Sequence, residues 1–209
     1  MKAARRVKIL GTGSFVPEKR LTNDELSRMV DTNDQWITER TGIQERRIAA
    51  EGMASSDLAV EAARRALQAA ELRPEDLDMI VFATSSPDRV VPASAVYLQK
   101  KIGAFNAGAV DNLAACSGFV YALSSGWGLV ANGQSNRCLV VGSEVLSRIT
   151  NYLDRTTCVL FGDGAGAVVL APSEDSGEIL YSKLGADGRL EHLIIAPAGG
   201  TAMMPTADR

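Results

Sequence analysis

The stretch that most constrains this chain runs from Ala109 to Leu123 and reads AVDNLAACSGFVYAL. An apolar run leads through small residues to Cys116 and Gly118, and apolar residues at helical spacing follow. The pattern predicts a strand, a tight turn and a helix, with Cys116 on the turn. Unpaired backbone N–H groups and the positive end of the helix dipole favour a thiolate there. We predict that Cys116 is a nucleophile that carries an acyl group, with an oxyanion stabilised by the same N–H groups.

The chain has two further cysteines, Cys138 and Cys158, and both lie in continuous apolar runs. They are predicted to be small buried core residues. Three scattered cysteines form neither a disulfide framework nor a metal-ligand pattern, so we expect no disulfide and no bound metal.

Size and charge set the broad class of the protein. With 209 residues, 46% of them apolar and 22% charged, the chain can bury one sizeable core or two small ones. No apolar run approaches the roughly 18–20 residues that span a bilayer, and no long apolar region follows the basic N-terminus. The net charge of −3 predicts no nucleic-acid binding. We expect a soluble, cytoplasmic protein with no membrane partner.

Strand and helix patterns alternate along most of the chain. An amphipathic helix is predicted to open at Ser55 and end before Pro74, and buried strands are predicted at Leu77–Thr84 and Leu139–Gly142. This rhythm predicts an α/β fold with a mostly parallel sheet covered on both faces.

Two glycine clusters invite a nucleotide-binding interpretation that their contexts do not support. Val16 stands where a dinucleotide fingerprint after Gly11 and Gly13 needs its third glycine, so these two are expected to serve a turn. The run 162–166 precedes a strand rather than a helix, which predicts a glycine-rich hairpin packed under a neighbouring loop. Beyond it, short strands are expected at 179–183 and 193–195.

A helix predicted to begin near Asn33 or Asp34 carries Trp36 and Arg40 on one face, because the two are four residues apart. An indole and a guanidinium can bracket a flat ring, and the guanidinium can also pair with phosphate. The alternative is that Trp36 packs in the core and Arg40 covers it. Arg46 and Arg47 extend a possible basic patch around Arg40, or are solvated surface charges.

Six motifs occur together in an order and spacing that resemble the 3-oxoacyl-(acyl-carrier-protein) synthase III family. They are GTGSFVPE, TNDELSRMVDTNDQWITERTGIQERRIA, VFATSSPD, LAACSGFVYAL, VVGSEVLSR and FGDGAGAVVL. The resemblance covers nearly the whole chain. It implies a thiolase-like fold of two similar halves, each a five-stranded mixed sheet with helices on both faces. Residues 1–172 would form the first half, which carries the nucleophile, and 173–209 would begin the connection to a second half that this chain lacks.

The resemblance also implies an activity and a site. Members start type II fatty-acid synthesis by decarboxylative condensation of an acyl-coenzyme A primer with malonyl-acyl-carrier protein. Cys116 would take the acyl group from acyl-CoA. Trp36 and Arg40 match the pair that holds the adenine end of the coenzyme, with Thr32 beside them and Arg155 on the opposite side. Coenzyme A would be a substrate rather than a permanently bound cofactor, and a homodimer is expected.

Two positions depart from the family pattern. Thr156 follows Arg155 where many members have glycine, which bears on the coenzyme contact. Val91 stands where some members place a bulky aromatic that closes the acyl pocket of the neighbouring subunit. A valine there predicts that primers longer than acetyl are accepted.

The third departure concerns the catalytic set. The family uses Cys, His and Asn, of which the last two lie in the second half, and the single histidine, His192, is outside the family motif and is predicted to be a surface residue. The 209 residues alone are therefore not expected to complete the condensation. Two alternatives remain open: a related acyltransferase of polyketide, hydrocarbon or quinolone synthesis, and a non-catalytic half that pairs with a partner chain.

Overall fold

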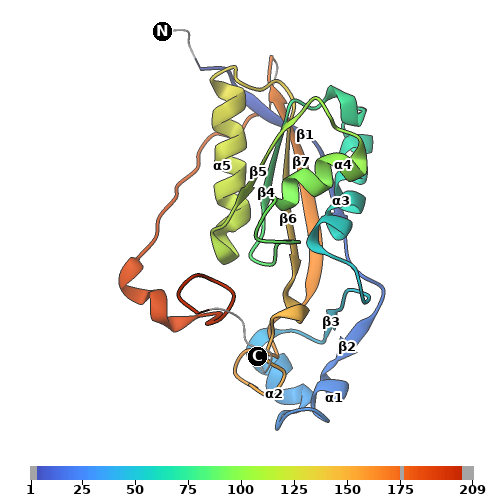
Figure 1. Cartoon of the computed structure of the whole chain (residues 1–209), viewed down its shortest axis with the longest axis vertical. Coiled ribbons are helices and arrows are strands. Elements are labelled where there is room, and N and C mark those ends of the chain that lie inside the picture. The colour runs from blue at the N-terminus through green and yellow to red at the C-terminus, as the bar shows by residue number, and fades with distance from the viewer. Residues whose placement is uncertain (1–3, 175–176, 204–209) are drawn as a thin grey trace.

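The computed structural model describes residues 4–174 and 177–203, and its centre is one five-stranded sheet (Figure 1). The strand order is β1 (Val7–Phe15), β7 (Asp163–Pro172), β6 (Cys138–Val145), β4 (Met79–Ala83) and β5 (Gly108–Asn112). Strands β5, β4 and β6 are parallel, whereas β7 is antiparallel to both β6 and β1. The sheet is therefore mixed, as the family resemblance predicted, and not mostly parallel as the helix–strand rhythm suggested.

Helices cover both faces of this sheet (Figure 1). On one face, α3 (Ser55–Ala69) and α4 (Ser94–Ile102) contribute their apolar side chains to the largest core cluster. On the other face, α5 (Gly118–Ala131) packs over a second cluster. The predicted α/β class and the amphipathic helix that opens at Ser55 are confirmed.

Gly11 and Gly13 do not form a turn, which corrects the sequence-based interpretation. Both lie inside β1, where helix α3 crosses very close to the strand. A β-carbon at either position would collide with backbone atoms of α3, at Ala62, Ala66 and Ala70. Glycine is needed here for close helix–strand approach rather than for a left-handed backbone.

A small group of elements lies beyond the end of the sheet at which β6 stops (Figure 1). It contains α1 (Asn23–Leu26), α2 (Asp34–Thr41) and a two-stranded sheet of β2 (Arg20–Thr22) and β3 (Glu45–Arg47). Its own core joins Leu26 and Ile37 to Cys158 and Val159, which follow β6 in the chain. We call these elements, with the segment 150–162, the satellite module.

Local capping explains the helices of the satellite module. Thr22 and Glu25 form a reciprocal capping box at α1, and the Asn33 side chain accepts a 2.8 Å hydrogen bond from the Trp36 backbone N–H of α2. Gly42, in a left-handed conformation, ends α2. Short 3₁₀ turns occur at Pro74–Asp76, Ala115–Ser117, Leu146–Arg148 and Gly188–Leu193.

The predicted glycine-rich hairpin is absent from the described structure. Residues 156–160 form turns, because the Asp154 carboxylate accepts hydrogen bonds from Thr156 and Thr157 and holds the chain bent. Strand β7 instead pairs with β6 and β1. The close packing is real, since a β-carbon on Gly162 would lie 3.1 Å from Cβ of Arg46 in β3.

The strands expected at 179–183 and 193–195 do not form either. Ile179 makes one backbone hydrogen bond, to the Val7 carbonyl at 2.9 Å, and the chain then runs beside α5. There Ser182 bonds to Ser124, and the Tyr121 hydroxyl donates to the Gly185 carbonyl at 3.0 Å. A helix surface offers side-chain partners but no backbone ladder, so an extended segment stays single there. The division of the chain at residue 172 remains a prediction.

Candidate active site

Cys116 lies on the predicted turn between edge strand β5 and helix α5. The preceding residue, Ala115, has a φ of +46°, a left-handed conformation that is uncommon for any residue other than glycine. The turn closes with a single 3₁₀ turn, after which α5 begins at Gly118. The Cys116 side chain is exposed. The strand, turn and helix are thus confirmed, and a strained backbone of this kind is common at functional sites.

Small residues let this turn sit on the sheet. A β-carbon on Gly118 would lie 3.4 Å from Cβ of Ala83, at the end of β4. The ring of Phe119 covers Gly142 in β6, where a β-carbon would lie 3.2 Å from it. The first turn of α5 is therefore held directly against the carboxyl end of β4 and the middle of the parallel strand β6.

Two carboxylates that the sequence patterns did not single out fix the loop between β4 and α4. Asp111 of β5 accepts hydrogen bonds from the backbone N–H groups of Ser94 and Ala95, at 2.6 and 2.8 Å, and so caps helix α4. Glu144 of β6 accepts bonds from the Ser85 N–H at 2.8 Å and from the Ser86 hydroxyl. A single carboxylate near the end of an apolar run in the sequence is the signal that both share.

Val91 lies in the loop that these carboxylates anchor, between β4 and α4. It is 79% exposed, and its neighbour Val90 is 86% exposed. Nothing among the described residues covers either side chain, so the expected acyl-pocket role of Val91 depends on contacts from outside this chain and remains a prediction.

Trp36, Arg40 and Arg155 come together in the satellite module. The Arg40 guanidinium carbon lies 4.6 Å from the Trp36 ring centroid, and that of Arg155 lies 4.9 Å from it. Arg155 also pairs with Asp31 at 3.4 Å. We call Trp36, Arg40 and Arg155 the indole cluster. Trp36 also packs against the core of the satellite module, so the geometry accommodates both of the interpretations drawn from its spacing.

Thr32 lies four residues before Trp36, and its hydroxyl is the one buried side-chain oxygen in the described part of the chain without a hydrogen-bond partner. A buried hydroxyl without a partner is unfavourable, so it is suited to a polar group of a ligand. Its predicted role remains to be tested.

Arg46 and Arg47 do not extend a basic patch around Arg40. Arg46 is only 3% exposed and donates to the Val159 carbonyl and the Asn23 side chain. Arg47 pairs with Glu45 at 3.2 Å and donates to the Pro17 carbonyl. Both side chains are structural links, and Arg46 is not a surface charge at all.

The three cysteines differ in exposure, as predicted. Cys138 and Cys158 are fully buried, whereas Cys116 is exposed. Burial raises the pKa of the Cys138 thiol to about 12 and also raises the pKa of Cys158. His192 is on the surface, as predicted, 3.7 Å from Glu191.

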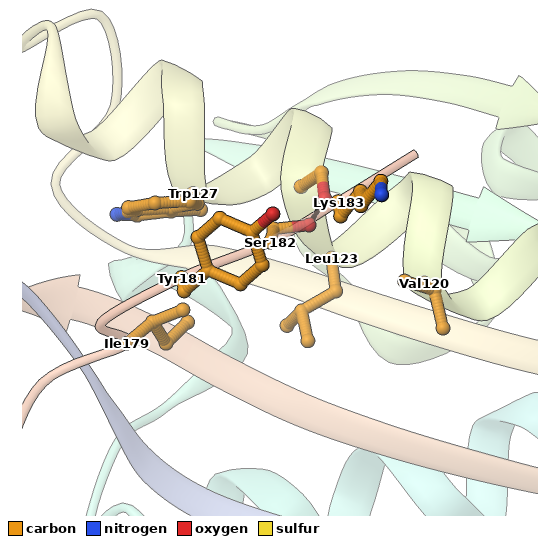
Figure 2. Close-up of a pocket in the computed structure, with 8 residues that line it drawn as sticks. Val120, Leu123, Trp127, Ile179, Tyr181, Ser182 and Lys183 are labelled. Carbon is orange, nitrogen blue, oxygen red and sulfur yellow. Dashed lines mark hydrogen bonds between the residues drawn. The ribbon is translucent and has the colours of Figure 1, made fainter. Parts of the chain in front are cut away.

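A cavity of about 210 Å³ lies between α5 and the segment 179–183 (Figure 2). Val120, Leu123 and Trp127 of α5 line one side, and Ile179 and Tyr181 line the other. None of the predicted site residues borders this cavity.

Among residues 4–174 and 177–203, no group of three His, Cys, Asp or Glu side chains is arranged to hold a metal ion. None of the described helices combines the length and apolar character required to cross a bilayer.

Comparisons with known proteins agree on one family. Residues 110–188 match the family model for 3-oxoacyl-[acyl-carrier-protein (ACP)] synthase III. A beta-ketoacyl-[acyl-carrier-protein] synthase III of Xylella fastidiosa is 57% identical over 192 residues, which are 92% of this chain and 59% of that protein. The chain thus spans about three fifths of this curated relative.

Solved structures give the same result. The crystal structure of 3-oxoacyl-[acyl-carrier-protein] synthase III from Aquifex aeolicus has a TM-score of 0.89 and 44% identity, covering 97% of this chain and 65% of that one. The priming beta-ketosynthase of the R1128 polyketide pathway has a TM-score of 0.80 and 38% identity, covering 84% of this chain and 52% of that one.

Proposed function

Because the chain belongs to the 3-oxoacyl-[acyl-carrier-protein] synthase III family, we propose that it contains the acyl-capturing part of a condensing enzyme that starts type II fatty-acid synthesis. One observation carries the proposal: an exposed cysteine follows a left-handed residue on the turn between an edge strand and a helix. This placement leaves the sulfur open to a large acyl donor, while the two other cysteines are buried in the core.

In the first step, the Cys116 thiolate attacks the thioester carbonyl carbon of acyl-CoA. The carbonyl electrons move onto oxygen, and backbone N–H groups at the start of α5 stabilise this oxyanion. When the carbonyl re-forms, the bond to the coenzyme sulfur breaks. Coenzyme A leaves as a thiolate that takes up a proton, and the acyl group remains on Cys116.

The indole cluster supplies the proposed binding site for the adenine end of the donor. Two guanidiniums already flank the Trp36 ring, and they can stack on a base and pair with phosphate oxygens. The unpartnered Thr32 hydroxyl adds one hydrogen-bonding group nearby in the chain. No other cofactor is needed for acyl transfer to a thiolate.

In the second step, malonyl-acyl-carrier protein loses carbon dioxide, and the resulting carbanion attacks the carbonyl carbon of the acyl-cysteine. The new carbon–carbon bond forms, the bond from the acyl group to the Cys116 sulfur breaks, and Cys116 is released as a thiolate. The developing charge on the malonyl thioester oxygen needs hydrogen-bond donors, and loss of one such donor lowers the rate about 100- to 1000-fold. The exposed His192 is paired with Glu191 and is not proposed for this role. We therefore propose that histidine and asparagine from outside these 209 residues complete the condensation, in a cytoplasmic homodimer.

Mass spectrometry after mixing the chain with acetyl-CoA tests the first step. The expected result is one acetyl adduct, located on Cys116 by peptide mapping, because this is the exposed thiol. The matched control is Cys116→Ala, which leaves the buried Cys138 and Cys158 in place. An adduct that persists in Cys116→Ala contradicts the assignment.

Val91 gives a second test, on primer length. Valine is smaller than the aromatic residue of some family members, so primers longer than acetyl are expected to acylate Cys116 at least as fast as acetyl-CoA. The assay compares acyl-CoA donors of increasing length, and Val91→Phe is expected to restore a preference for acetyl. It requires the assembled dimer, since Val91 is 79% exposed in the single chain. A strict preference for acetyl with Val91 in place contradicts the idea.

A polyketide-type condensing enzyme is a second candidate, favoured by the 38% identity to the R1128 priming beta-ketosynthase. Both candidates share acyl capture on Cys116 and differ in product, so analysis of the product formed with malonyl carrier protein separates them. A non-catalytic partner half is the third alternative. It predicts no acyl adduct on Cys116. In the mass measurement above, an adduct on Cys116 therefore rejects this alternative, and its absence supports it.

A further inference from the structure

Arg46 is a buried cation, and the groups that accept its hydrogen bonds are neutral. Its Nε and Nη2 donate to the Val159 carbonyl at 3.0 and 2.6 Å, and its Nη1 donates to the Asn23 side-chain oxygen. Burial lowers the pKa of the guanidinium, because the charged form is desolvated. Arginine still remains charged in proteins. Burial of a charged side chain is unfavourable, so the hydrogen bonds of Arg46 are expected to serve a purpose in the structure.

One acceptor of Arg46 lies in the segment that carries Arg155, and the other, Asn23 of α1, bonds to the helix that carries Trp36 and Arg40. Val159 lies four residues after Arg155, in the same turn-rich segment, and 113 residues from Arg46 in the chain. Asn23, the first residue of α1, bonds to both ends of α2. Its amide nitrogen donates to the Asp34 carboxylate, at the start of α2, and to the Ile43 carbonyl just after its end, both at 2.8 Å. Arg46 therefore connects the helix that carries Trp36 and Arg40 with the segment that carries Arg155.

The backbone around Arg46 is adapted to this connection. Gly162 lies against β3, and a β-carbon there would be 3.1 Å from Cβ of Arg46 and 3.3 Å from the Arg47 carbonyl. Only a glycine permits β3 to approach the segment 159–162 without displacement. This close approach is what brings the guanidinium within reach of the Val159 carbonyl.

We infer that Arg46 is a positioning residue for the donor coenzyme: it fixes α2 and the segment 154–160 relative to each other, so that Arg40 and Arg155 both face Trp36. The inference rests on the proposed function, in which the indole cluster binds the adenine end of acyl-CoA. Arg46 is only 3% exposed, so a donor at the indole cluster is not expected to contact it directly. Its effect should therefore be seen only with donors that have an adenine end.

The test compares two donors on the 209-residue chain. Acylation rates of Cys116 are measured with acetyl-CoA and with acetyl-pantetheine, which has the same thioester but lacks the adenine nucleotide. In Arg46→Met, the acetyl-CoA rate is expected to fall about tenfold, as for loss of charged buried hydrogen bonds. The acetyl-pantetheine rate is expected to stay within about twofold, because β5, the Cys116 turn and α5 do not depend on Arg46.

Two further variants control for folding. Arg46→Lys keeps a cation but cannot bridge both acceptors, and it should show the same selective loss in a milder form. Arg47→Met removes a neighbouring guanidinium that bonds Glu45 and Pro17 instead of the segment 154–160, and it should leave both rates unchanged. Coenzyme A binding is also followed by Trp36 fluorescence in a Trp127→Phe background, since the chain has two tryptophans.

The possible outcomes distinguish failure of this inference from failure of the proposed function. If the unmodified chain prefers acetyl-CoA and both Arg46 variants lose the two rates in equal proportion, Arg46 has only a structural role and the inference is overturned while the proposed function stands. If the unmodified chain shows no preference for acetyl-CoA and no coenzyme A binding, the adenine-site assignment is overturned together with the inference. A selective loss with acetyl-CoA, matched by weaker coenzyme A binding, supports the inference.

Discussion

The turn that carries Cys116 and the cluster around Trp36 are positioned by different kinds of contact. The turn is continuous with β5 and α5 and rests on β4 and β6 through close apolar contacts at Gly118 and Phe119. The indole cluster lies outside the sheet, in the satellite module, whose small core joins segments more than a hundred residues apart. Buried polar side chains, chiefly Asn23 and Arg46, complete that connection.

This difference predicts how each region responds to change. Damage to the sheet should affect the Cys116 turn and the indole cluster together, because the satellite module is attached to the carboxyl end of β6. Under the proposed function, damage inside the satellite module should weaken donor binding while Cys116 keeps its reactivity. Substitutions in each region test this difference.

The largest effect is expected from Gly13→Val. A side chain here collides with the backbone of α3 at Ala62 and Ala66, and overpacking of this kind costs about 3 kcal/mol. For a chain of this size the melting temperature should fall by roughly 6–12 °C. Thermal unfolding followed by circular dichroism measures the change, and both donors should lose activity together near the lowered transition.

The control for this prediction is Gly166→Ala on strand β7, opposite Ser14 of β1. A β-carbon there meets nothing within 4 Å, so the melting temperature should hardly change. If Gly13→Val is as stable as Gly166→Ala, the close crossing of α3 over β1 does not contribute as described.

A smaller and more selective effect is expected from Trp36→Ala. Stacking of a base on an aromatic ring contributes about 1–3 kcal/mol, so acetyl-CoA capture should weaken about tenfold to a hundredfold at low donor concentration. Acetyl-pantetheine capture should stay close to that of the unmodified chain, since the Cys116 turn makes its contacts elsewhere. A loss of the same size with both donors would remove the distinction between the two regions.

The smallest effect is expected from Thr156→Gly, which introduces the residue of many family members. The Thr156 hydroxyl bonds to the Asp154 carboxylate at 2.6 Å, and in the described structure it forms no hydrogen bond with the indole cluster. Coenzyme A binding, measured by Trp36 fluorescence, should therefore change less than about threefold, as for most surface substitutions. A larger change would mean that the bend at Asp154 sets the position of Arg155.

Sequence patterns predicted the elements whose signals are local. The strand, turn and helix around Cys116 follow from an apolar run, small residues and helical spacing within fifteen residues. The amphipathic helix that opens at Ser55 is equally local, and it is present. The motifs that led to the family, and the expectation that Trp36 and Arg40 share a helix face, also needed no tertiary information.

Sequence patterns were wrong where a residue's role depends on what lies beside it. Gly11 and Gly13 have the same local signal as turn glycines, but they lie in β1 because α3 crosses there. The run 156–160 has strand-forming residues, yet it bends around Asp154 and has no strand to pair with. Residues 179–183 also have a strand pattern, and they meet helix α5 instead of a sheet edge.

Spacing within short stretches of the sequence was enough to predict the α/β class, the family and the placement of Cys116 on a turn before a helix. The folded chain was needed to reveal that Arg46 is buried, that it connects α2 with the Val159 segment through Asn23, and that Arg155 meets Trp36 beside Arg40. Those relations join residues separated by more than a hundred positions. No local pattern encodes such contacts, which arise only when the packed core brings the segments together.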